Sequence, residues 1–156
     1  MKNSELMEKF KEICKRHRIR VRRIKSGPNR ANSKQKTVWI REITDPGGFA
    51  AALHEIGHAM CDPDNPPQNH CETLDVETNA WRWALDHNGD KFDAAGWKRL
   101  HESLHHYYVS VMNPAHPAHA LLVRAEQHVP TIRCRVSSYG APGLTPVPKK
   151  TSKPQP

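Results

Sequence analysis

The sequence has no hydrophobic run that could cross a membrane and no cysteine pair with the spacing of a zinc ribbon. Its longest apolar stretch, residues 47–53, is far shorter than the roughly 20 residues that span a bilayer, and the charged N-terminus lacks the apolar segment of a signal peptide. The four cysteines form no CxxC pair and show no sign of a disulfide framework. We therefore expect a cytoplasmic protein with reduced thiols and no membrane association.

Acidic and basic residues are separated along the 156-residue chain, whose formal net charge is +8. Residues 45–90 carry nine acidic residues against one arginine, whereas residues 1–25 carry ten Lys or Arg against three Glu. An acidic middle suits a segment that binds a cation, and a basic N-terminal segment suits an acidic partner or nucleic acid. Basic residues that only face solvent are the alternative interpretation.

The apolar pattern predicts an α+β fold that is mostly helical. Residues 19–24 and 37–43 have the alternation and β-branched content of strands, and we expect them to pair as a short antiparallel sheet. The chain around residues 31–35 is predicted to be a loop. Apolar residues recur at helical spacing over residues 4–17, 72–88, 94–112 and 118–127.

One modest core can form from 37% hydrophobic residues in a chain of this length. We therefore expect a single domain over residues 1–136, with its core over about 35–112. Residues 137–156 are rich in Pro and Lys and have almost nothing to bury, so they are predicted to form a flexible tail.

The most informative segment is His54-Glu55-Ile56-Gly57-His58, which lies in a predicted helix between a start signal at Asp45-Pro46 and a stop at Asp62-Pro63. Two histidines four residues apart lie on one face of a helix, so both imidazoles can reach one ion at the Zn–N distance of about 2.0–2.1 Å. Glu55 lies rotated toward the open side of the metal, where a carboxylate can take a proton from water. A pair of surface histidines beside an ordinary Glu is the alternative.

A catalytic zinc needs a third protein ligand and an open position for water. Glu77 is the best acidic candidate, because it lies on the next predicted helix on the same face as Ala80 and Ala84, small residues that let that helix approach the first. His70 is the main rival, and Cys71 is a minor one. The other acidic candidates in this region are Asp62, Asp64, Glu72 and Asp75.

The two helical segments together resemble a known family. Residues 54–60, HEIGHAM, are similar to the HELGHAL segment of the ImmA/IrrE-type zinc metallopeptidases, and residues 77–84, ETNAWRWA, are similar to their downstream ExxANxFA segment. The resemblance covers about residues 35–88. Trp81 stands where that family usually has Asn, and Trp83 stands where it has Phe.

This resemblance implies a small zincin-like domain whose sheet packs against the metal-binding helix. It implies Zn²⁺ as the cofactor, with a gluzincin-like ligand set of His54, His58 and Glu77, and Glu55 as the catalytic base. A further donor must stabilise the tetrahedral oxyanion, and the candidates are His70, His105, His106, Tyr107 and Tyr108. His101 and His105 also have the spacing of a metal pair, although Leu104 and Tyr108 beside them favour a structural role.

The function predicted from these residues and the resemblance is that of a zinc metallopeptidase, a hydrolase that cleaves a peptide bond in an intracellular protein. The resemblance implies that the substrate is often a repressor of a phage or mobile element. The alternative is a basic DNA- or protein-binding regulatory module with a structural or inactive zinc site, although no helix-turn-helix motif is recognisable. A zinc hydrolase that acts on another kind of bond is a third possibility, because the motif specifies water activation and not the scissile bond.

Overall fold

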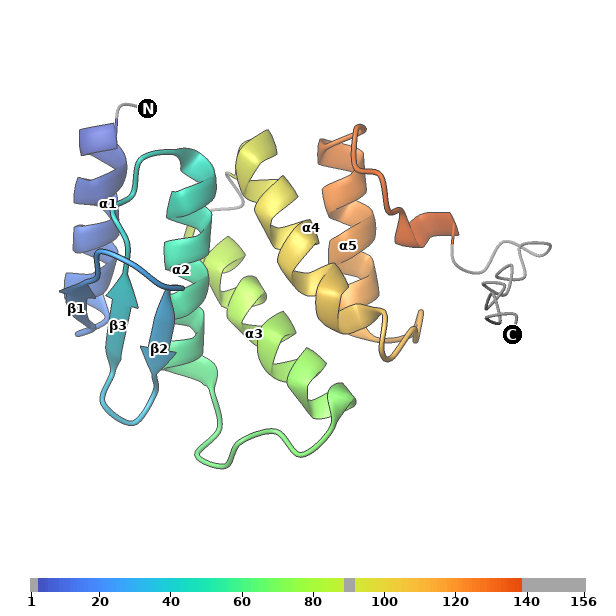
Figure 1. Ribbon diagram of the computed structural model, residues 1–156, viewed down its shortest axis with the longest axis horizontal. Coiled ribbons are helices and arrows are strands. Elements are labelled where there is room, and N and C mark those ends of the chain that lie inside the picture. Colours follow the sequence, from blue (N-terminus) through green and yellow to red (C-terminus); the bar gives the residue numbers. More distant parts are fainter. Residues whose placement is uncertain (1–2, 89–91, 139–156) are drawn as a thin grey trace, which may run out of the picture.

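The computed structural model describes residues 3–88 and 92–138 (Figure 1). The elements follow the order α1 (Asn3–Arg16), β1 (Arg20–Arg23), β2 (Arg30–Asn32), β3 (Thr37–Ile40), α2 (Pro46–Cys61), α3 (His70–Asn88), α4 (Ala94–Tyr108), α5 (Pro117–His128) and a 3-10 turn (Val136–Ser138). The predicted α+β class is confirmed. Residues 139–156 of the predicted tail lie outside the described residues. Within residues 3–88 and 92–138, none of the helices combines the length and apolarity needed to span a bilayer.

The sheet has the strand order β1-β3-β2 and is mixed rather than antiparallel. The expected pairing between the strands near residues 20 and 40 is found, but β1 and β3 run parallel. A parallel pair needs a long connection, and here the connection contains β2, which pairs antiparallel with β3. The segment predicted as a loop therefore holds an edge strand. Its three residues, Arg-Ala-Asn, include no β-branched or aromatic side chain, so propensity gives no sign of it.

Helix α2 has the bounds that its capping residues predict. The Asp45 carboxylate accepts a hydrogen bond from the Gly48 amide at 2.8 Å, and Pro46 occupies the first turn. Helix α3 begins at residue 70, two residues earlier than predicted, with the Asn69 side chain accepting from the Glu72 amide at 2.9 Å. Helix α4 ends at Tyr108, earlier than predicted, and the following turn contains Met112 at a positive φ of 47°.

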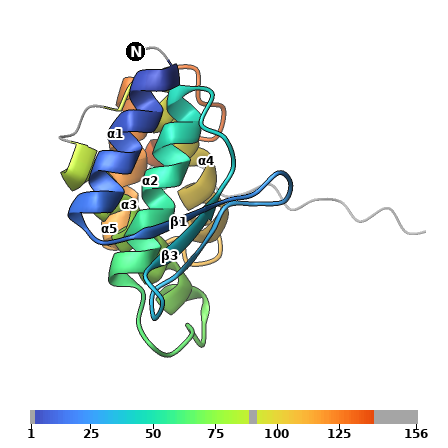
Figure 2. The ribbon, with the colours of Figure 1, turned by 90° about the vertical axis from the view of Figure 1, so that its left-hand side faces the viewer.

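Helix α2 contacts α1, α3, α4, β2 and β3. The sheet lies at one end with α1 and α2, whereas α4 and α5 pair at the opposite end (Figure 1). From the sheet end, α1 and α2 lie side by side (Figure 2). Because α2 is covered on several sides, its apolar faces are buried and its remaining face can line a groove.

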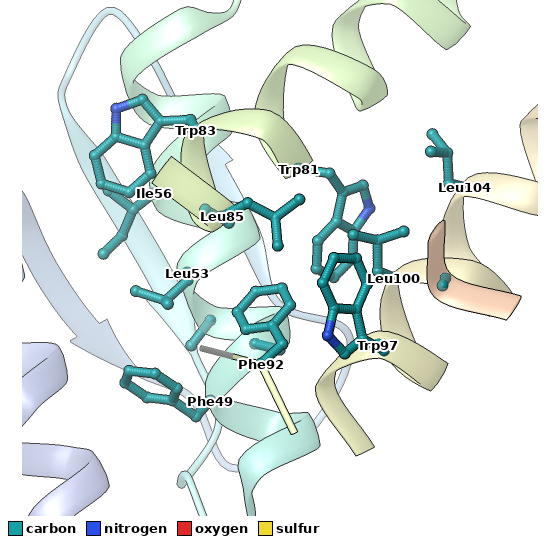
Figure 3. Packing of buried hydrophobic residues seen from close by; sticks show 14 of the residues in the cluster. Phe49, Leu53, Ile56, Trp81, Trp83, Leu85, Phe92, Trp97, Leu100 and Leu104 are labelled. Atoms are coloured by element: carbon teal, nitrogen blue, oxygen red, sulfur yellow. The ribbon is translucent and has the colours of Figure 1, made fainter. Parts of the chain in front are cut away.

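The core between α2, α3 and α4 is built around aromatic rings. Trp81 packs edge-on against Phe92 with ring centroids 6.3 Å apart, and Phe92 packs edge-on against Trp97 at 6.0 Å (Figure 3). Trp81 and Trp97 are each only 1% exposed. Such edge-to-face contacts add to the stabilisation that burial of large apolar surface already gives. Trp81 thus anchors α3 in the core and holds the neighbouring residues of this helix in place.

Candidate metal centre

Helices α2 and α3 meet in direct backbone contact at Gly57. A Cβ atom placed on Gly57 would lie 2.3 Å from the carbonyl oxygen of Ala80 and 2.7 Å from its Cα. No side chain fits at that distance, so glycine is required for the two helices to approach this closely. Glu77, one turn before Ala80, is thereby brought against the histidines of α2. The small residues predicted on α3 are therefore matched by a glycine on α2.

The structure brings His54, His58 and Glu77 into one cluster that could hold a metal ion, with one ligand atom of each residue within 4.8 Å of the others. The Glu77 Oε2 atom lies 3.2 Å from His54 Nε2 and 3.6 Å from His58 Nε2, and the two Nε2 atoms are 3.0 Å apart. Ligands about 2.0–2.1 Å from a tetrahedral zinc lie roughly 3.4 Å from one another. The three atoms are therefore spaced as ligands of one ion.

The two rival ligands lie elsewhere. His70 and Cys71 are exposed in the first turn of α3 and are not part of the cluster. Glu77 is seven residues further along the helix, and a rise of 1.5 Å per residue places it roughly 10 Å away along the axis. His70 and Cys71 lie at the N-terminal end of α3 and are therefore separated from the histidines of α2.

His58 is held by Asp62, which the sequence indicates as part of the helix stop and as a possible third ligand but not as this partner. The Asp62 Oδ1 atom lies 2.8 Å from His58 Nδ1, and this contact leaves Nε2 free to face the cluster. A carboxylate on the second ring nitrogen is the usual outer partner of a metal-binding histidine. The spacing of four residues, from the last turn of α2 to its C-cap, is the signal that could have identified this pair.

His54 is held by a ring contact instead. Its ring stacks on Trp81 with centroids 4.3 Å apart and an interplanar angle of 23°. His54 Nδ1 is buried and has no hydrogen-bond partner in the described part of the chain. Trp81 itself donates from Nε1 to Ser103 Oγ at 3.3 Å. The tryptophan therefore fixes the orientation of the imidazole by stacking.

The three candidate ligands have strongly shifted pKa values. Burial alone would raise the pKa of Glu77, but hydrogen bonds with His54 and His58 outweigh it and lower the pKa to about 2. Burial lowers the pKa of His54 and favours its neutral form, which is the form that binds metal. Burial also acts to lower the pKa of His58, but Asp62 and Glu77 raise it to about 10. Metal binding at this cluster would therefore displace a proton from His58.

Glu55 lies beside the cluster without belonging to it. Its side chain is half-buried and lines the same groove as the two histidines. Burial raises the pKa of its carboxyl group to about 7. A general base is most effective when its pKa lies near the working pH, because it must both accept and release a proton. The position and pKa of Glu55 suit a proton-transfer role.

A groove with a volume of about 1490 Å³ opens over these residues. Helix α2 lines it from Asp45 to Asp62, α3 contributes Glu77 and Trp81, and α4 contributes residues from Arg99 to Tyr107. The remaining wall is formed by residues between Arg23 and Ala31 and by Arg41, Glu42 and Thr44, which follow β3. The candidate metal centre is thus exposed to a space that can admit a long ligand.

Tyr107 is an oxyanion candidate that interacts with the cluster. Its pKa is raised by the negative charge of Glu77, with which its hydroxyl forms a hydrogen bond. His106 also lines the groove, whereas His105 lines a separate cavity and His70 lines neither. The Tyr108 hydroxyl is buried and lies 2.8 Å from His119 Nδ1. Tyr107 and His106 thus line the groove, whereas His70, His105 and Tyr108 do not.

A second H-E-x-x-H segment, His101-Glu102-Ser103-Leu104-His105, lies on α4. Only its histidine pair was singled out in the sequence, and Glu102 was overlooked. His101 Nε2 lies 3.4 Å from Glu126 Oε1, but these residues do not form a group that could hold a metal ion in the described part of the chain. The burial of His101 and its carboxylate partner agree with the predicted structural role of the pair.

Comparison of the chain with protein-family models, with curated proteins and with solved structures finds no match in any of the three. The resemblance to ImmA/IrrE-type metallopeptidases therefore rests on the two motifs alone and stays a prediction.

Proposed function

We propose that this protein is a zinc-dependent metallopeptidase in which Glu55 is the general base. One observation carries the proposal: three ligand atoms converge beside a carboxylate of raised pKa on the floor of a groove. Two imidazoles and one carboxylate, with a position left for water, form a ligand set typical of catalytic zinc. The length of the groove favours an extended polypeptide as the substrate.

Zinc bound by His54, His58 and Glu77 would supply the Lewis acid that acidifies water and polarises a carbonyl group. Glu55 then accepts the proton of the attacking water and delivers it to the amine that leaves. The Tyr107 hydroxyl, which faces the groove, donates a hydrogen bond to the carbonyl oxygen as negative charge develops on it. Asp62 and Trp81 keep the two imidazoles oriented throughout.

The test is a Glu55→Gln variant of the zinc-loaded full chain, assayed on a quenched fluorescent peptide library. We expect zinc affinity to stay unchanged and cleavage to fall by about 10²–10⁴-fold, the contribution of a positioned general base. Glu102→Gln is the matched control, because Glu102 occupies the same place in the second H-E-x-x-H segment but lies outside the cluster, and it should lower cleavage far less than Glu55→Gln does. Undiminished cleavage by Glu55→Gln, or no cleavage by the zinc-loaded wild type, would refute the proposal.

A further inference from the structure

Four cationic side chains are brought to one end of the sheet by the strand register. Arg23 pairs with Ile40 in the parallel ladder of β1 and β3, so the C-terminal ends of both strands lie side by side. Arg30 pairs with Trp39, so the antiparallel strand β2 begins at the same end of the sheet. Lys25 and Arg41 follow directly after β1 and β3. All four cations line the groove of the candidate metal centre.

A fifth cation, Arg99, lines the groove from α4. It lies one turn after Ala95, whose carbonyl oxygen would be 3.5 Å from a Cβ placed on Gly47. That contact places the beginning of α4 beside the beginning of α2. Arg99 therefore lies beside the N-terminal half of α2, and Arg41 lies on the short segment that leads into that helix, whereas the histidine cluster lies in its C-terminal half.

Four of the six acidic residues that line the groove are engaged within the protein. Asp45 caps α2, Asp62 contacts His58 and Glu77 contacts both histidines. Glu102 pairs with Lys98 at 3.8 Å. Apart from Glu55, the proposed base, this leaves Glu42 as the acidic lining residue with no side-chain partner within the described residues.

The cations are not engaged in this way. The side chains of Arg23, Lys25, Arg41 and Arg99 are exposed and form no hydrogen bond or ion pair within residues 3–88 and 92–138. Arg30 lies over the Trp39 ring, 5.1 Å from its centroid. Free guanidinium groups recognise carboxylates through paired hydrogen bonds. This end of the groove is therefore available to an anionic ligand.

We propose that the groove selects polypeptides with Asp or Glu a few residues from the scissile bond, and that Arg23, Lys25, Arg41 and Arg99 bind those carboxylates. This inference rests on the proposed function. The groove follows α2 for about 25 Å, from Asp45 to Asp62, which is the length of roughly seven extended residues. When an acidic segment of the substrate binds at the basic end, the scissile peptide bond a few residues away can therefore lie over the histidine cluster.

An acidic polypeptide fits this groove better than a nucleic acid does. A phosphate backbone has a negative charge at every step, so along the groove it would pass Glu55 and Glu77 at the histidine cluster as well as the cations. A polypeptide can place its carboxylates at the basic end and neutral residues over the candidate metal centre. The charge asymmetry of the groove therefore favours a ligand whose charge is also localised.

The first experiment measures binding with the zinc-loaded Glu55→Gln chain and fluorescent twelve-residue peptides, one with acidic residues in one half and one with the corresponding Asn and Gln. We expect the acidic peptide to bind about tenfold more tightly, and R23Q/R41Q to abolish the difference. R20Q/R22Q is the matched control, since Arg20 and Arg22 lie on the same strand but outside the groove. Equal binding of both peptides would overturn the inference.

The second experiment measures cleavage by the zinc-loaded wild-type chain. Peptides cut from a mixed library should be enriched in Asp and Glu on one side of the cut, and R23Q/R41Q should raise KM about tenfold for an acidic peptide without changing kcat. Cleavage with no acidic preference would refute this inference and leave the proposed function intact. Binding that depends on Arg23 and Arg41 without cleavage would refute the proposed function alone. A DNA oligonucleotide that binds through Arg23 and Arg41 more tightly than the acidic peptide would overturn the inference in favour of nucleic acid.

Discussion

The two H-E-x-x-H segments lie on neighbouring helices, yet their histidine rings are arranged differently. On α2 the rings of His54 and His58 meet edge to face, with centroids 4.4 Å apart and an interplanar angle of 78°. On α4 the rings of His101 and His105 are stacked, with centroids 5.3 Å apart and an angle of 13°. Only the first pair directs two Nε2 atoms toward one point, where they lie 3.0 Å apart. The same sequence spacing therefore gives two different geometries.

The carboxylates that approach the two pairs are also used differently. Glu77 offers one oxygen to both histidines of α2. Glu126, only 3% exposed, reaches His101, but it also accepts hydrogen bonds from the amides of Val136 and Ser137 and from the Ser137 hydroxyl. Those bonds attach the 3-10 turn to α5. One carboxylate is thus available to an ion, and the other holds the chain together.

The fourth residue of each segment explains how the surroundings come to differ. It is Gly57 on α2, where α3 passes in backbone contact, and Leu104 on α4, where a fully buried side chain fills the space. On α2 the neighbouring helix brings one carboxylate against both histidines, whereas on α4 the contact given for Glu126 is with His101. The approach of the neighbouring element, rather than the spacing of the histidines, therefore decides which segment can hold a metal ion.

The largest effect is expected from removal of the carboxylate on the α2 side. Glu77→Ala should lower zinc affinity by more than about 100-fold, since loss of a ligand exceeds the 10–100-fold cost of losing an outer partner. Calorimetric titration of the metal-free chain measures it. Glu126→Ala should bind zinc like the wild type. Equal zinc affinity in the two variants would contradict the assignment of Glu77, rather than Glu126, as a metal ligand.

Removal of the carboxylate on the α4 side should instead cost stability. Glu126→Ala leaves two amides and a hydroxyl without their acceptor, and we expect the free energy of unfolding to fall by about 2–4 kcal/mol. Urea denaturation measures the change. Glu102→Ala, which removes an exposed partner of Lys98, should cost less than about 1 kcal/mol. Similar losses in both variants would contradict the structural role of Glu126.

The contact at Gly57 can be disrupted directly. Gly57→Ala would force α3 away from α2, and we expect a loss of about 1–3 kcal/mol in stability together with weaker zinc binding. Gly48→Ala in the same helix is the control, because its Cβ would lie 3.7 Å or more from its neighbours. If both variants unfold and bind zinc alike, the close approach of the helices does not position Glu77.

A smaller effect is expected from the group that orients His58. Asp62→Asn should lower zinc affinity by about 10–100-fold, because it weakens the acceptor on Nδ1 while all three ligands remain. The exposed Asp64 in the following loop provides the control, and Asp64→Asn should have no effect. Unchanged zinc affinity in Asp62→Asn would show that this carboxylate has no part in holding the imidazole.

Much of this site could be predicted from the sequence, because its strongest signals are local. Asp45 and Asp62 define the ends of α2, and the spacing within each helix places His54, His58 and Glu77 on suitable faces. The stacking of Trp81 on His54 depends instead on how α3 crosses α2, and spacing within one helix does not reveal it.

The sheet was predicted less well than the helices. Strand β2 has only three residues, and its pairing with β3 is set by tertiary contacts rather than by propensity. The convergence of Arg23 and Arg30 at one edge follows from the register of two ladders that the antiparallel prediction did not contain. Features that depend on the relative placement of distant segments were the ones that the sequence did not reveal.

Zinc stoichiometry of the two histidine pairs tests the central claim most directly. The metal-free full chain is titrated with Zn²⁺ in a calorimeter as wild type, as H54A/H58A and as H101A/H105A. We expect one tightly bound ion per chain in the wild type and in H101A/H105A, and none in H54A/H58A. No tight binding by the wild type, or one ion retained by H54A/H58A, would contradict the assignment of the metal centre to α2 and α3.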